Sequence, residues 1–269
     1  MSELTWFYPK NMEEAVELIA REGVIPHGGG TGLLRGSLKG VRGLVDLTRL
    51  NLQFQRTHGR RVELGACTTF AEAAAYLRGL GEECVLSQSL ASAASTPLRN
   101  RITLGGSVSL FPPWSDLMGP LLALDAEVVL AGNAAGTYSV EQYTNEKQLR
   151  RGGLITTVQF DLKPLHYFYY REARTFSDHP VFTLTLLCGR DGNHIGEFKA
   201  VVTGCVGRYM RLKKLEELLR GASIESIESD RIAQVSNVRF AGKKAMSPEY
   251  LKHLVVVQIE RGLAAFSRR

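Results

Sequence analysis

The feature that most constrains this chain is a cluster of glycines near its N-terminus. Residues 26–34 read Pro-His-Gly-Gly-Gly-Thr-Gly-Leu-Leu, so four of the five positions from Gly28 to Gly32 carry no side chain. Glycine adopts positive φ angles readily, and consecutive backbone N–H groups in such a segment can converge on one anion. The segment therefore predicts either a phosphate-binding nest or a tight turn between a strand and a helix. Leu33 stands where a Rossmann fingerprint has its third glycine, and no Gly-Lys-Ser/Thr completes a Walker loop.

A second glycine segment lies downstream. Adjacent glycines, Gly105 and Gly106, stand between Thr103 and Ser107, and a Ser-Asp pair that ends at Asp116 follows them. Two such segments can hold a pyrophosphate from two sides. The Asp116 carboxylate is suited to accept hydrogen bonds from ribose hydroxyls, and it is equally suited to cap the helix expected over residues 117–124.

The patterns up to residue 164 predict alternating helices and strands. Asn11 with Glu14, and Thr69 with Glu72, have the spacing of helix N-terminal capping boxes. A helix is also expected to end at Leu124, directly before a strand. Strands are expected where β-branched and apolar residues gather, at residues 43–47, 61–66, 127–130 and 154–160. The result is an α/β or α+β arrangement with short connections.

Beyond Pro164, which we take as the domain boundary, strand-like runs precede helix-like runs. Strands are expected at residues 181–188 and 198–204, and helices at residues 211–220 and from Ser247-Pro248 onward. This segregation predicts a small α+β domain. We therefore expect two domains, residues 1–164, with subdomains of about 1–55 and 56–164, and residues 165–269.

The cysteines and the N-terminus narrow the class of protein. Four cysteines are far apart, and no C-x-x-C pair provides the usual ligand spacing of a zinc site or an iron–sulfur cluster, so we expect no metal site and buried thiols. They are Cys67, Cys84, Cys188 and Cys205. The first residues show no basic start followed by an apolar core, and no run is long enough to span a membrane. We therefore expect a cytoplasmic protein.

The net charge of +6 is compatible with nucleic acid, an anionic cofactor or an acidic partner. Residues 166–174 form an aromatic and basic run that could in principle stack bases. Alternation within a strand is the commoner cause of such a run, so we do not expect a nucleic-acid partner.

Together, these segments resemble the FAD-binding subunits of the xanthine dehydrogenase and carbon monoxide dehydrogenase family, which are the medium subunits of molybdenum hydroxylases. The first segment is similar to the family's A-G-G-T-D-L-L-like pattern, and Thr103-Leu104-Gly105-Gly106-Ser107 is similar to its T-I-G-G-N-like pattern. The downstream Ser115-Asp116 and the run from Leu121 to Val128 are also typical. This resemblance covers nearly the whole chain. It implies an α+β fold with a two-part FAD-binding domain of the PCMH type, followed by a small domain of antiparallel sheet plus helices.

The resemblance also implies the residues around FAD. Both glycine segments would wrap the pyrophosphate, Asp116 would hold the ribose, and the Ile155 backbone would lie near the adenine or the flavin. Arg171 falls where the family often has a lysine close to the flavin, although a solvated cation at a strand edge is an equally good interpretation. The full set of implied contacts is Pro26, His27, Gly28, Gly29, Gly30, Thr31, Gly32, Leu33, Ala93, Thr103, Leu104, Gly105, Gly106, Ser107, Asp116, Ile155 and Arg171. Arg174 and Asp178 follow the family spacing too, and a structural ion pair would explain them equally well.

The chain departs from the family pattern at three places. Gly32 replaces the usual acidic residue, Ser107 replaces the usual asparagine, and Phe111-Pro112-Pro113-Trp114 replaces a smaller and more polar stretch. The first two changes remove hydrogen bonds that would help to retain FAD. The third either covers the cofactor or packs against a partner.

The resemblance implies an electron-transfer subunit. An iron–sulfur subunit and a molybdopterin-binding large subunit would be its partners, and FAD would pass electrons to NAD or another acceptor. Two alternatives stay open. One is a stand-alone flavin oxidoreductase of the vanillyl-alcohol-oxidase type, although few residues follow Pro164 for its substrate domain. The other is a non-catalytic assembly module with an FAD-binding fold.

Overall fold

The computed structural model describes residues 4–33, 36, 38–81, 84–223, 229–242 and 246–268. The chain divides into two compact units. Unit 1 consists of residues 1–80, 95–111 and 124–162, and unit 2 consists of residues 81–94, 112–123 and 163–269. Two short early segments thus belong with the C-terminal residues. The domain boundary at Pro164 stays a prediction.

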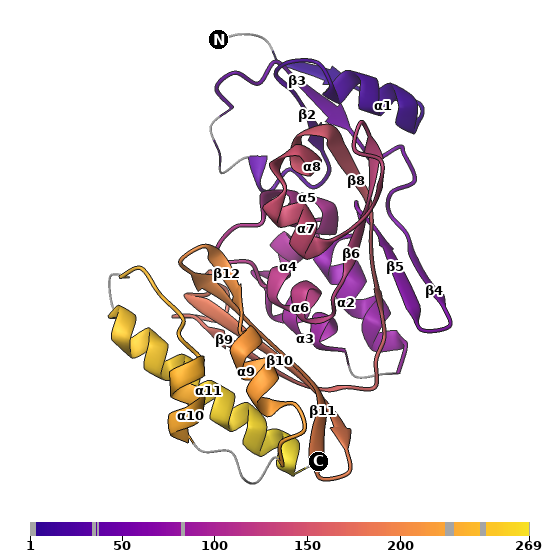
Figure 1. Cartoon of the computed structure of the whole chain (residues 1–269). Coiled ribbons are helices and arrows are strands. Elements are labelled where there is room, and N and C mark those ends of the chain that lie inside the picture. Colours follow the sequence, from indigo (N-terminus) through magenta and orange to yellow (C-terminus); the bar gives the residue numbers. More distant parts are fainter. Residues whose placement is uncertain are drawn as a thin grey trace. The chain divides into compact units, whose positions relative to one another are not determined.

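Unit 1 begins with a three-stranded parallel sheet and one helix (Figure 1). Its strands are β1 (Thr5–Phe7), β2 (Val24–His27) and β3 (Gly43–Asp46), in the order β1-β3-β2. Helix α1 (Met12–Ile19) begins at Asn11, whose side chain accepts a hydrogen bond from the Glu14 backbone N–H at 2.9 Å. This confirms the predicted cap. Ala15 and Leu18 of α1 are buried in a core with Val45.

The rest of unit 1 is a five-stranded antiparallel sheet with short helices. Its strands, in spatial order, are β4 (Gln55–His58), β5 (Arg61–Gly65), β8 (Gly153–Asp161), β6 (Glu127–Gly132) and β7 (Gly136–Ser139). Its helices are α2 (Phe70–Gly79), α4 (Thr96–Arg99), α5 (Leu104–Leu110), α7 (Val140–Asn145) and α8 (Lys147–Gly152). Thr69 and Glu72 form the predicted capping box at the start of α2. The expected strands at 61–66, 127–130 and 154–160 are confirmed as β5, β6 and β8.

Unit 2 is built on a four-stranded antiparallel sheet in the order β12-β11-β10-β9. Its strands are β9 (His166–Glu172), β10 (Phe182–Asp191), β11 (His194–Cys205) and β12 (Arg208–Arg211). Its helices are α3 (Val85–Ser92), α6 (Met118–Ala123), α9 (Lys213–Leu219), α10 (Ser229–Val235) and α11 (Pro248–Ser267). Ser247 caps α11 by accepting from the Tyr250 backbone N–H at 3.1 Å, as its sequence predicts.

Helices lie on both faces of this sheet. A Cβ at Gly262 of α11 would lie 2.5 Å from Leu186, whereas a Cβ at Gly119 of α6 would lie 2.8 Å from the Thr185 hydroxyl. Neighbouring residues in a strand point to opposite faces, so α11 and α6 cover opposite sides. The core on the α11 side is apolar, and the α6 side carries buried threonines. The α+β fold with an antiparallel C-terminal sheet is confirmed.

The aromatic run of residues 166–174 is explained by strand β9. Phe168 and Tyr170 pack against the apolar core of unit 2, and the Tyr169 hydroxyl lies on the other side, where it donates to Asp116 at 2.8 Å. The run therefore follows strand alternation, as we expected from the sequence.

Candidate functional site

The first glycine segment follows directly from strand β2, which ends at His27. Gly30 adopts a φ of +75°, and a Cβ at this position would lie 2.7 Å from Nε2 of His27. Any other residue would therefore be strained by its backbone and by this contact. The turn out of β2 depends on glycine at this position.

The two glycine segments lie against each other within unit 1. A Cβ at Gly29 would lie 1.6 Å from the carbonyl oxygen of Arg101, so no side chain fits there. The Arg101 guanidinium also donates to the Gly29 carbonyl oxygen from Nε at 3.3 Å and from Nη2 at 3.1 Å. The prediction that two distant glycine segments act at one place is therefore consistent with the structure.

Glycines of both segments lie beside the side-chain hydroxyl of Thr103. A Cβ at Gly28 would lie 3.3 Å from Oγ1 of Thr103, and a Cβ at Gly106 would lie 2.8 Å from the same atom. Thr103 is buried and Gly106 is exposed. Backbone groups of two segments and one hydroxyl are thus close together at a surface of unit 1.

The second glycine segment forms the start of helix α5. Thr103 is the N-cap residue of α5, and Gly105 and Gly106 belong to its first turn. A Cβ at Gly105 would lie 2.7 Å from that of Ala66, and the Gly105 N–H donates to the Ala66 carbonyl at 2.8 Å. Gly105 therefore serves the packing of α5 against the chain that follows β5.

These residues fit the pyrophosphate of FAD. Side chains at Gly28 and Gly106 would fill the space beside the Thr103 hydroxyl, and we call this space the cradle. His27 Nδ1, beside the same turn, is buried and has no hydrogen-bond partner among the residues that the structure describes. The rings of Trp6 and His27 form a T-shaped pair with 4.9 Å between their centroids. A ligand with several acceptor oxygens matches this set of donors.

Gly32 is the first departure from the family pattern. The space that a side chain at this position would fill is occupied by a neighbouring residue. A Cβ at Gly32 would lie 2.0 Å from Cδ1 of Leu110, the last residue of α5. Leu110 is 52% exposed, so its side chain has room to turn away. The space of the missing acidic side chain is therefore taken by a movable leucine.

Asp116 and Arg171 form a buried ion pair in unit 2. Arg171 Nε donates to Asp116 Oδ1 at 2.8 Å, and the side chains are 10% and 7% exposed. The interpretation of Arg171 as a solvated cation is therefore wrong, while its place near the flavin stays a prediction. Burial raises the pKa of the Asp116 carboxyl, and Arg171 and Tyr169 oppose that rise.

The other interpretation of Asp116, as a helix cap, does not hold. Ser115 Oγ accepts from the backbone N–H groups of Leu117 and Met118, both at 3.3 Å. Ser115 therefore satisfies the exposed donors ahead of α6. The carboxylate of Asp116 is left for Arg171 and Tyr169.

The remaining predicted residues lie in several elements. Ala93 is the buried C-cap of α3 in unit 2, Ile155 is buried in β8, and Leu104 is buried at the start of α5. Arg174 and Asp178 form an ion pair at 3.1 Å. The roles of all these residues toward FAD stay predictions.

The cysteines show no sign of a reactive site. Cys84, Cys188 and Cys205 are buried, and burial together with the nearby Asp46 raises the pKa of the Cys67 thiol to about 11. Among the described residues, no group of three or more His, Cys, Asp or Glu side chains is placed to hold a metal ion. In the same part of the chain, no helix has the length and apolar character needed to cross a membrane.

Comparison with known proteins defines the class. Residues 2–161 match the family model described as the FAD-binding domain in molybdopterin dehydrogenase. The match spans more than half of the chain, which therefore belongs to this family. FAD is accordingly its cofactor, and the chain is a flavoprotein and an oxidoreductase subunit.

Particular relatives agree with this class. The chain is 25% identical over 252 residues to the nicotinate dehydrogenase FAD-subunit of Eubacterium barkeri, covering 85% of this chain and 84% of that protein. It is 22% identical over 247 residues to the glyceraldehyde dehydrogenase medium chain of Sulfolobus acidocaldarius, covering 87% and 88%.

Solved structures show the same fold. A chain of the reconstituted CO dehydrogenase from Oligotropha carboxidovorans superposes with a TM-score of 0.89 at 19% identity, covering 97% of this chain and 96% of that chain. A chain of quinoline 2-oxidoreductase from Pseudomonas putida 86 superposes with a TM-score of 0.88 at 18% identity, covering 99% and 97%. The similarity extends through both units.

Proposed function

We propose that this chain is the electron-transfer subunit of a larger molybdenum-containing hydroxylase or dehydrogenase complex. In this proposal, electrons arrive from iron–sulfur clusters of a partner and leave to NAD or another acceptor. The chemistry that FAD supplies when bound is reversible uptake of one or two electrons. The names "FAD-subunit" and "medium chain" of two relatives support the expectation of partner subunits for this chain.

The observation that carries the proposal is the meeting of the two glycine segments at Thr103. Backbone N–H groups of residues 28–33 would bind the pyrophosphate oxygens, and the hydroxyls of Thr103 and Ser107 would add donors. Arg171 would lie on the flavin side, as the resemblance implies.

The experiment is a comparison of flavin content in two valine variants. Gly28→Val fills the cradle, while its Cβ meets only side-chain atoms at 3.3 Å or more. Gly79→Val adds the same group at the end of α2, where a Cβ meets nothing within 4 Å. We expect the purified wild-type protein and Gly79→Val to show flavin absorbance and to release FAD on denaturation. Gly28→Val should retain at most a tenth of the FAD, a change of about 1.4 kcal/mol in binding free energy.

Three outcomes would contradict parts of the proposal. Full FAD content in Gly28→Val would show that the cradle is placed wrongly. A colourless wild-type protein that cannot be reconstituted with FAD would favour a non-catalytic assembly module. Turnover of an organic substrate by the isolated subunit would favour a stand-alone flavin oxidoreductase. Reduction of the bound flavin by NADH would identify NAD as the acceptor.

A further inference from the structure

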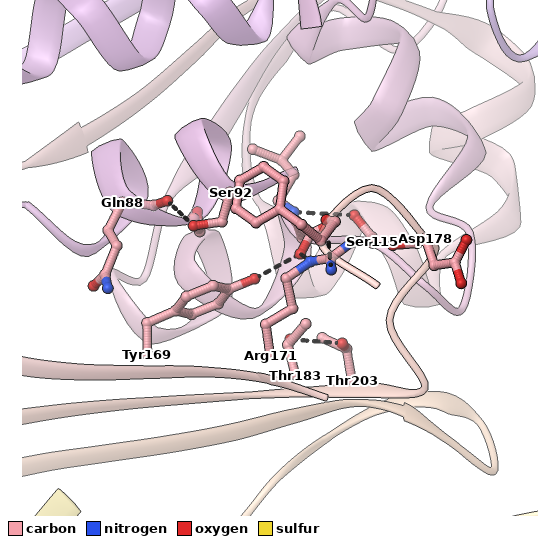
Figure 2. A network of polar contacts seen from close by, with 12 residues as sticks. Gln88, Ser92, Ser115, Tyr169, Arg171, Asp178, Thr183 and Thr203 are labelled. Atoms are coloured by element: carbon pink, nitrogen blue, oxygen red, sulfur yellow. Dashed lines mark hydrogen bonds and ion pairs between the residues drawn. The ribbon is translucent and has the colours of Figure 1, made fainter. Parts of the chain in front are cut away.

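Unit 2 contains a buried polar network that the pyrophosphate cradle does not use (Figure 2). Its centre is Asp116 Oδ1, which accepts from Arg171 Nε and from the Tyr169 hydroxyl, each at 2.8 Å. Tyr169 and Arg171 are alternate residues of β9, so they stand on one face of the strand. The carboxylate comes from a segment more than fifty positions earlier in the chain.

The same arginine also binds the connection between β9 and β10. Its Nη1 donates to the carbonyl oxygen of Phe176 at 3.3 Å, and its Nη2 donates to that of Asp178. One planar guanidinium thus joins Asp116 to two backbone carbonyls. Such a geometry needs a fork of several N–H groups, which lysine does not have.

Residues 174–177 of the connection are exposed. The Asp178 N–H donates to the Thr175 carbonyl at 3.3 Å, and Arg174 pairs with Asp178 at the surface. Phe176 is 69% exposed. The end of the connection is held separately, because Val181 packs on the core of unit 2 and its N–H donates to the Glu172 carbonyl at 2.7 Å. Arg171 is the residue that binds the mostly exposed part, residues 174–178.

We infer that Asp116, Tyr169 and Arg171 form a latch that fixes residues 174–178, in which Asp116 is a positioning residue for Arg171. The oxygen facing the network already accepts two donors, and the side chain is nearly inaccessible. Asp116 also balances the charge of Arg171. The part of this inference that concerns the flavin rests on the proposed function, which places Arg171 on the flavin side.

Hydrogen exchange measured by mass spectrometry tests the latch. Asp116→Asn removes the charge with little change of shape, and Arg171→Lys keeps the charge but loses the fork. We expect amides of residues 174–178 to exchange at least tenfold faster in both variants. Arg174→Lys, which changes the exposed pair of the same connection, is the matched control and should exchange as the wild type does. Tyr169→Phe removes one donor and should give a smaller increase, which keeps the test decisive if another variant fails to fold.

The FAD content and the flavin midpoint potential of the same samples distinguish the possible roles of Asp116. As a positioning residue, Asp116→Asn should keep its FAD and raise the flavin midpoint potential, because the Arg171 charge is no longer balanced. A tenfold change of the two-electron equilibrium corresponds to about 30 mV. Faster exchange with an unchanged potential would confine Asp116 to a structural role and overturn the positioning inference.

Two further outcomes have distinct meanings. Loss of FAD from Asp116→Asn with wild-type exchange in residues 174–178 would make Asp116 a ribose ligand and would overturn the latch. A wild-type protein that binds no FAD would contradict the proposed function, and with it the inferred role of Asp116 toward the flavin. The exchange measurements would still decide whether the latch exists.

Discussion

At the residue scale, the departure at Gly32 is coupled to Leu110. The sequence shows the loss of an acidic side chain, but it does not show that a leucine from α5 has taken the space. A Cβ at Gly32 would lie 2.0 Å from this leucine, so the two positions must be changed or moved together. Contacts between residues 78 positions apart depend on the fold and cannot be predicted from local spacing.

We predict that Gly32→Asp folds normally and retains FAD more tightly than the wild type. Leu110 is half exposed and can rotate away, and the carboxylate would restore the hydrogen-bond acceptor of the family pattern. An increase of about threefold to tenfold in FAD affinity corresponds to roughly 0.6–1.4 kcal/mol, the range of one hydrogen bond. Fluorescence titration of the apoprotein with FAD measures this change.

The double variant Gly32→Asp with Leu110→Ala is the control for this prediction. If Leu110 alone limits the gain, the double variant should bind FAD at least as tightly as the single variant. Weaker binding by both variants would show that the glycine at position 32 is itself required by the cradle.

At the scale of elements, helix starts were predictable and the second glycine segment was not. Asn11, Thr69 and Ser247 each cap a helix as their sequence patterns predict. Two of the four residues 104–107 are glycines, and glycine in a helix costs about 1 kcal/mol relative to alanine. Tertiary packing overrides this preference, because Gly105 must approach Ala66 closely. Short strands such as β4 and β7 carry too few alternating residues to be recognised alone.

We predict that Gly105→Val destabilises unit 1 as well as its cofactor site. The added Cβ would lie 2.7 Å from the Ala66 Cβ and 3.0 Å from the Ala66 carbonyl oxygen, and neither is the end of a flexible side chain. Overpacking of this kind lowers the free energy of unfolding by about 1–3 kcal/mol. Thermal denaturation of the apoprotein should show a lower midpoint, while Gly79→Val should melt within about 2 °C of the wild type. An unchanged midpoint for Gly105→Val would contradict the packing role of this glycine.

At the scale of the whole molecule, the sequence indicated a subunit that works with partners, and Trp114 is its candidate contact. Trp114 packs on His179 at 5.1 Å between ring centroids and is 37% exposed. Such a ring can cover a cofactor or meet a partner. The pairing of Asp116 with Arg171 and the ring contact of Trp114 both join residues far apart in sequence, so neither was predictable.

We predict that Trp114→Ala weakens co-purification with an iron–sulfur subunit while the FAD content stays normal. Buried aromatic residues at interfaces often contribute 2 kcal/mol or more, so we expect at least a tenfold loss of affinity. Tyr250→Ala, at an aromatic residue of α11 that is 51% exposed, is the matched control. Loss of FAD with unchanged association would instead show that Trp114 covers the cofactor.

The division of the chain into two units also determines the order in which it can be completed during synthesis. Helices α3 and α6 are made early, yet they contact strands β9, β10 and β11 of unit 2, which the ribosome produces at least forty residues later. Until those strands emerge, buried residues such as Leu86 and Leu121 have no sheet to cover. Unit 1 is therefore interrupted twice by segments that must wait for residues 163–269. Because of this order, neither unit can be obtained by cutting the chain once, and a ribosome that stalls near residue 164 leaves two apolar helices exposed to chaperones and proteases.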